Sequence, residues 1–197
     1  RLVRARGIEM AKAAALSPAG MSAVLGGDRE VVLKKLEELK LVAANDNGGG
    51  QIVAAGDLAA LAALSENPPE GARVRALAVA GAFHTSFMEP AVEPLRTLAA
   101  TIQTAPTTIS VISNKDGEVV SDGAQVLTRI VNQIANPVRW DLCMQTLKNL
   151  GVTGVIELPP AGTLVGLLKR GAPEIETFAL KSADDLSAAK EFAGRHA

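Results

Sequence analysis

The chain has 197 residues, enough for one large domain or two small ones. A formal net charge of −1 argues against a nucleic-acid-binding protein that relies on bulk electrostatics, and a single cysteine, Cys143, excludes a disulfide framework and suits a reducing cytoplasm. Apolar residues make up 48% and aromatic residues 3%, so the core must consist of Ala, Val and Leu, and neither a membrane-spanning run nor a signal peptide is predicted.

The first residues already follow a helical pattern. In "RLVRARGIEMAKAAAL", apolar residues recur at three- and four-residue intervals, as on one face of a helix. No capping residue precedes them. We therefore expect the sequence to begin inside a helix, with an N-terminal part of the protein missing from it.

Residues 20–83 are predicted to form a compact α+β unit. Strands are expected at 20–27, 41–45, 51–56 and 73–83, and helices at 28–40 and 57–67. Asp28 and Asp57 are the expected N-caps of the two helices. The order β-α-β-β-α-β is that of a ferredoxin-like unit.

Helices and strands alternate in the rest of the chain. Helices are predicted at 88–104, 122–135, 139–150, 162–171 and 182–196, and strands at 107–114, 154–158 and 177–180. The alternation indicates a parallel α/β layer. We expect residues 1–19 and 84–197 to form a larger α/β domain, into which residues 20–83 are inserted as a small subdomain.

His84 is the first candidate for chemistry. The strand predicted over 73–83 ends just before it, and Ser86 with Glu89 fits a capping box for the next helix, although Pro90 fits that register poorly. The positive end of a helix dipole disfavours imidazolium, and a neutral imidazole is what a general base requires. A structural histidine bonded to the backbone explains the same pattern, and the local residues leave both interpretations open.

Arg6 is the second candidate. Helical geometry places it on the apolar stripe with Leu2, Val3 and Met10, where an arginine needs a partner. A ligand carboxylate would suit its guanidinium, but the residues alone favour an internal salt bridge.

Two further stretches have weaker signals. "NDNGGGQ" (45–51) joins two strands and offers backbone N–H groups for a phosphate or an amide, although an ordinary turn is the simpler interpretation. "ELPPAGTLVGLLKR" (157–170) is either a ligand-facing loop or simple strand–helix punctuation. Trp140 is expected to anchor the core. The histidine and cysteine spacing supports no metal site, and no G-x-S-x-G elbow is present.

Seven ordered stretches, covering nearly the whole chain, resemble malonyl-CoA:acyl carrier protein transacylases, particularly the actinobacterial kind. They are "VRARG" (3–7), "GMSAVLGGD" (20–28), "NDNGGGQIVAAG" (45–56), "VAGAFHTSFMEPA" (79–91), "SNKDG" (113–117), "QIANPVRWDLC" (133–143) and "ELPPAGTL" (157–164). The resemblance implies an α/β-hydrolase-like acyltransferase domain with an inserted ferredoxin-like subdomain.

The resemblance also implies roles for individual residues. His84 matches the catalytic histidine, Gln133 the residue whose backbone carbonyl orients that ring, and Arg6 the arginine that binds the malonyl carboxylate. The loop lining the pantetheine channel is matched by Asn45, Asn47 and Gln51.

The sequence "GAFH" (81–84) is similar to a "HAFH" signature associated with malonyl selectivity, in which a bulky ring leaves little room for an α-methyl branch. Phe83 supplies that ring, while Gly81 departs from the signature.

The activity that the resemblance implies is ping-pong transfer of malonyl from malonyl-CoA to the phosphopantetheine thiol of acyl carrier protein, in cytoplasmic fatty-acid synthesis. No cofactor, metal, nucleic acid or membrane is implied. The family's nucleophilic serine would lie upstream of Arg6, outside this sequence. Two alternatives stay open: a polyketide-type acyltransferase for another acyl-CoA, and a non-catalytic fragment that binds acyl groups or a carrier protein.

Overall fold

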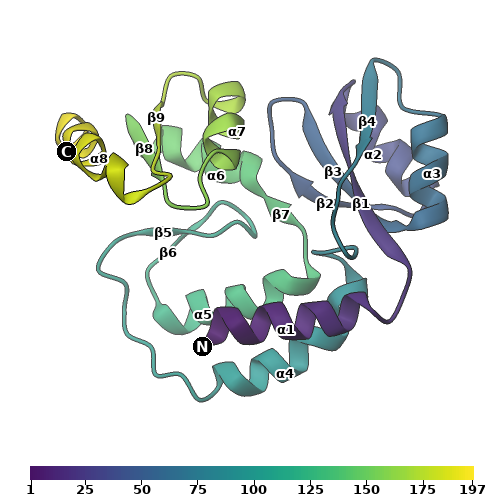
Figure 1. Cartoon of the computed structure of the whole chain (residues 1–197), viewed down its shortest axis with the longest axis horizontal. Helices are drawn as coiled ribbons and strands as arrows, with labels where there is room; N and C mark the ends of the chain where they lie inside the picture. The colour runs from purple at the N-terminus through teal and green to yellow at the C-terminus, as the bar shows by residue number, and fades with distance from the viewer.

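The computed structural model describes all residues, 1–197, and is an α/β structure whose elements fall into three groups (Figure 1). One group is a sheet with two helices, the second is a layer of helices, and the third is a C-terminal unit with a short parallel strand pair. No helix is both long and apolar enough to cross a membrane.

The first group confirms the six elements predicted between residues 20 and 83. They are β1 (Ala19–Gly26), α2 (Arg29–Glu38), β2 (Val42–Asp46), β3 (Gln51–Asp57), α3 (Leu58–Glu66) and β4 (Ala72–Ala76). The strands form an antiparallel sheet of order β4-β1-β3-β2. The carboxylates of Asp28 and Asp57 accept hydrogen bonds from backbone N–H groups in the first turns of α2 and α3, as expected of N-caps.

The two faces of this sheet have different neighbours. Val24 and Ile52 belong to a core cluster with Leu36 of α2 and Leu64 of α3, so both helices cover one face. The alternate residues Met21, Val53 and Ala55 pack with Ala82, and Phe83 and Phe87 lie against the same cluster. The segment that contains His84 therefore covers the second face.

The strand predicted over 73–83 is too long, since β4 ends at Ala76. The N–H of Leu77 still donates to the carbonyl of Met21 at 3.0 Å, and the chain then leaves the sheet. β4 is an edge strand with one neighbour, so leaving interrupts only one ladder. The departing segment packs against α1 (Leu2–Ala14), where a Cβ on Gly81 would lie 2.7 Å from that of Ala14.

The second group is helical. It contains α1, η1 (Ser86–Met88), α4 (Glu89–Ala99), α5 (Gly123–Asn132) and η2 (Gln133–Ala135). Their core includes Met10, Met88, Leu95 and Ile134. The first helical turn after His84 is capped by Thr85, whose Oγ1 accepts from the N–H of Phe87 at 3.3 Å, so the predicted Ser86–Glu89 capping box is wrong. Pro90 is accommodated in the first turn of α4, where no intrahelical N–H is required.

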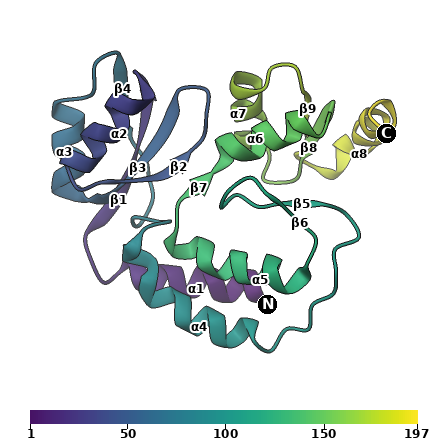
Figure 2. The ribbon, with the colours of Figure 1, turned by 180° about the vertical axis from the view of Figure 1, so that it is seen from behind.

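The third group follows β7 (Val138–Arg139), which pairs in parallel with β2 and joins the sheet to the helical layer (Figure 2). It comprises α6 (Trp140–Asn149), β8 (Gly154–Glu157), α7 (Thr163–Gly171), β9 (Glu176–Ala179), η3 (Ala183–Asp185) and α8 (Leu186–Arg195). β8 and β9 are parallel. The predicted strand 107–114 is mostly irregular, because β5 (Val111–Ile112) pairs only with the two residues of β6 (Val119–Val120). The expected continuous parallel layer is therefore not present.

Candidate active site

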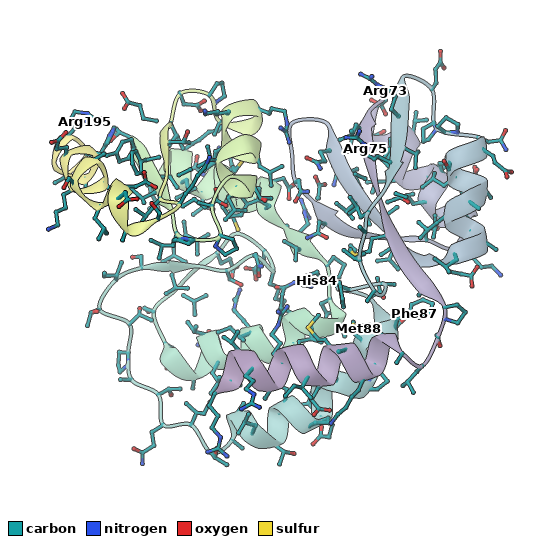
Figure 3. All side chains as sticks on the ribbon, in the orientation of Figure 1. Arg73, Arg75, His84, Phe87, Met88 and Arg195 are labelled. Carbon is teal, nitrogen blue, oxygen red and sulfur yellow. The ribbon has the colours of Figure 1, made fainter.

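A cavity of about 1200 Å³ lies among the three groups, and most residues that line it are apolar. All of the predicted site residues except Gln51 contribute to its wall: Arg6, Asn45, Asn47, Phe83, His84 and Gln133. Figure 3 shows His84 near the junction between α1 and the sheet of β1–β4. The fold thus brings together residues separated by up to 127 positions in the chain, from Arg6 to Gln133.

His84 is held at its backbone and at its ring by η2. Its N–H donates to the carbonyl of Ile134 at 3.2 Å, and ring Nδ1 lies 2.7 Å from the carbonyl oxygen of Gln133. A carbonyl oxygen can only accept, so Nδ1 carries the hydrogen and the neutral ring has a free lone pair on Nε2. No serine, threonine or cysteine hydrogen-bonds to this ring.

The backbone of His84 is in the left-handed region, with φ 61°. This conformation costs a residue with a side chain about 1–2 kcal/mol. Such strained residues cluster at functional sites, where the surrounding structure holds them in place. The bond to Ile134 fixes this backbone conformation.

The electrostatics of His84 favour a neutral ring. Burial lowers the pKa of His84, the bond to the Gln133 carbonyl opposes that shift, and the positive charge of Arg6 lowers the pKa further. The net pKa lies below the ordinary value of 6.5. His84 is therefore predominantly unprotonated near neutral pH, as a general base must be.

Arg6 is half-buried in the cavity wall and forms no salt bridge, so the internal ion pair that its local sequence favoured is wrong. Burial lowers the pKa of its guanidinium, with no carboxylate to oppose the shift. A partly desolvated cation without a partner is costly, and a planar carboxylate is the anion that best satisfies the guanidinium.

Gln51 lies outside the main cavity. Its Oε1 accepts a hydrogen bond of 2.7 Å from Nη2 of Arg170 at the end of α7, and it lines a separate cavity of about 150 Å³. Asn45 and Asn47, at the other end of the same loop, do line the main cavity. The loop is therefore pinned to α7 at one end and presents amides to the main cavity at the other.

Glu157 was not recognised in the sequence as a site residue. Its side chain is buried, and it accepts hydrogen bonds from the N–H groups of Gly162, Leu164 and Val165 at 2.8–3.0 Å. It thereby folds the loop over 158–162 onto the start of α7, whose Thr163 and Leu164 line the cavity. A glutamate that ends a strand just before Pro-Pro-x-Gly was the available signal.

Trp140 also lines the cavity rather than serving only as the expected core anchor, and so does Cys143. Burial is the main cause that raises the pKa of the Cys143 thiol to about 11, which leaves it protonated and a poor nucleophile at neutral pH. No group of three or more His, Cys, Asp or Glu side chains is arranged to hold a metal ion.

No family model matches the chain. It is 54% identical over 185 residues to the malonyl CoA-acyl carrier protein transacylase of Mycobacterium tuberculosis, covering 94% of this chain and 61% of that protein. The crystal structure of MCAT from Mycobacterium tuberculosis superposes with a TM-score of 0.91 at 53% identity, covering 95% of this chain and 62% of that one. A malonyl-transacylase solved in complex with a type II PKS acyl-carrier protein gives a TM-score of 0.87 at 27% identity, covering 97% of this chain and 64% of the matched chain.

These similarities define the class as the malonyl-transacylases. More narrowly, the chain is a homologue of the mycobacterial malonyl CoA-acyl carrier protein transacylases, and it spans less than two thirds of the length of the Mycobacterium tuberculosis protein.

Proposed function

We propose that this chain supplies the general base and the carboxylate-binding residue of a malonyl-CoA:acyl carrier protein transacylase. The observation that carries the proposal is that neutral His84 and unpaired Arg6 line one apolar cavity. A free Nε2 can accept a proton, and a cation without a partner can bind a substrate carboxylate. The mycobacterial transacylase homologues support the same assignment.

The reaction is a ping-pong acyl transfer. His84 Nε2 takes the proton of a serine hydroxyl as that oxygen attacks the malonyl thioester, and CoA leaves with the proton. The thiol of a carrier-protein phosphopantetheine then attacks the acyl-serine, and His84 again accepts and returns the proton. The Gln133 carbonyl takes the orienting part that a carboxylate plays in a Ser-His-Asp triad. The serine is supplied by a segment outside this sequence.

Substrate selection follows from the rest of the wall. Arg6 binds the malonyl carboxylate, and Phe83 restricts space beside the acyl α-carbon. The amides of Asn45 and Asn47 bind the polar groups of pantetheine, while Gln51 holds their loop through Arg170. The transfer needs no cofactor.

The proposed architecture is an α/β-hydrolase-like acyltransferase domain, formed by 1–19 and 84–197, with residues 20–83 inserted as a ferredoxin-like subdomain. The sheet order β4-β1-β3-β2 and the helices on one face support the second assignment. The partners are malonyl-CoA and an acyl carrier protein in the cytoplasm, with no nucleic acid or membrane involved.

The test is acyl transfer by the full-length protein with malonyl-CoA and acetyl-CoA in competition. Arg6→Met should reduce the malonyl preference by about 100-fold or more, because a site built for a polar group discriminates strongly. Arg4→Met is the matched control, since Arg4 is exposed on the same helix and outside the cavity. An unchanged preference in Arg6→Met would make Arg6 structural, and a full-length protein without any transfer would favour the non-catalytic binding fragment.

A further inference from the structure

The side chain of Gln133 makes contacts separate from those of its backbone carbonyl. Its amide nitrogen Nε2 donates to the carbonyl oxygens of Asn136 and Pro137, at 2.8 and 2.6 Å. The residue is 7% exposed, and its other amide atom, Oε1, is buried without a partner. Reversing the amide would point Oε1 at two carbonyl oxygens, so the two donated bonds determine its orientation.

These bonds close the turn that holds His84. η2 spans only Gln133–Ala135 and is followed by an extended Asn136 and then Pro137, which has no N–H to donate. The backbone bond that closes η2, from the Asn136 N–H to the Gln133 carbonyl, is long at 3.4 Å. The side-chain bonds therefore supply restraint that the backbone of this turn lacks.

The turn also connects two walls of the cavity. Next along the chain is Val138 of β7, which pairs with Asn45 of β2. Gln133 thus bonds with its carbonyl to the ring of His84 and with its side chain to the two residues that lead into β7.

We propose that the Gln133 side chain is a positioning residue, which holds η2 so that its carbonyl keeps the His84 ring protonated at Nδ1 and basic at Nε2. This inference rests on the proposed function, in which Nε2 is the base. Without the amide donors, η2 loses two restraints, the carbonyl leaves the ring plane, and the Nδ1 proton is no longer selected.

The test combines ¹⁵N NMR of histidine-labelled full-length protein with acyl-transfer kinetics. Gln133→Glu keeps the shape of the side chain but, when ionised, has no donor for the two carbonyls. Gln133→Met removes all its hydrogen bonds without adding charge. Gln145→Glu is the matched control, because Gln145 is exposed and bonds only to Asn149 on α6. His84→Gln assigns the His84 signals and shows whether this ring is the base.

Both Gln133 variants should change the His84 tautomer toward the form protonated at Nε2. They should lower kcat about tenfold to a hundredfold at unchanged KM, as expected for a displaced catalytic group. A wild-type tautomer and titration curve in both variants would overturn the proposal, and so would the same change in Gln145→Glu. If the tautomer changes while His84→Gln retains full activity, the positioning stands and the proposed function of His84 fails.

Discussion

Arg6 lowers the pKa of His84 across the cavity that the two residues share. One residue comes from α1 and the other from the segment after β4, and neither has an acidic side chain hydrogen-bonded to it. The cation thus has two effects in the proposed enzyme. It binds the substrate carboxylate, and it helps keep the base unprotonated.

Arg6→Met should raise the pKa of His84, because removing a nearby positive charge makes the imidazolium less unfavourable. The acid limb of the pH profile of kcat/KM should move to higher pH by the same amount as the NMR titration of His84. Arg6→Lys retains the charge and should leave the titration close to that of the wild type. Equal His84 titration curves in the wild type and Arg6→Met would contradict an electrostatic effect of Arg6.

His84→Gln should lower acyl transfer about 10²- to 10⁴-fold, the usual contribution of a positioned general base. His196→Gln is the control, because His196 lies at the C-terminal end, bonded to Thr153 and Glu176, and outside the cavity. Single-turnover kinetics with malonyl-CoA would measure both. Near-normal turnover in His84→Gln would remove this residue from the mechanism.

Phe83→Ala should relax the preference for malonyl-CoA over methylmalonyl-CoA by about tenfold or more, the usual range for one methyl group in an apolar pocket. The ratio of the two kcat/KM values measures this effect. Phe87→Ala provides the comparison, because Phe87 is another half-buried ring in the same segment but does not line the cavity. If both variants relaxed selectivity equally, loosening of the segment rather than the Phe83 ring would be responsible.

Glu157→Gln should lower the free energy of unfolding at neutral pH by about 1–3 kcal/mol, since hydrogen bonds to a buried carboxylate are lost or weakened. Burial alone would raise the pKa of Glu157, but the bonds from the N–H groups of Val165, Leu164 and Gly162 outweigh it and lower the pKa. A lowered folded-state pKa stabilises the fold above the unfolded pKa of about 4.3, and this stabilisation is lost as the pH falls through the folded value.

Urea unfolding at several pH values would test this, with the exposed Glu66→Gln as the reference. The difference between wild type and Glu157→Gln should shrink as the pH falls below about 4. A difference independent of pH would show that the charge of Glu157 contributes nothing.

Local signals predicted the small sheet unit well. Asp28 and Asp57 cap the helices that they were expected to cap, and Ser182 completes a capping box with Asp185 before the last helix. Caps and hydrophobic periods act within a few residues, so the sequence contains them. The end of β4 depends instead on the contact between Gly81 and Ala14, which no window around residue 76 contains.

The site was predictable in a different way. The local pattern left His84 between a base and a structural histidine, and it favoured a salt bridge for Arg6 that the structure does not contain. The contact between His84 and Gln133 joins residues 49 positions apart, so only the family resemblance could suggest it. Gln51 was expected to share the channel with Asn47, but it binds Arg170, 119 positions away in the sequence. Long-range pairs of this kind leave no periodic trace in a single sequence.

The close approach of Gly81 to Ala14 makes α1 a spacer of fixed length. Ala14 sets where the His84 segment meets the helix, and Arg6 lies eight residues earlier, about 12 Å along the axis. Inserting or deleting one residue between them would turn the guanidinium by about 100° around the helix and out of the cavity. Substitutions on the outer face of α1 are therefore tolerable at this site, whereas changes in its length between Arg6 and Ala14 are not.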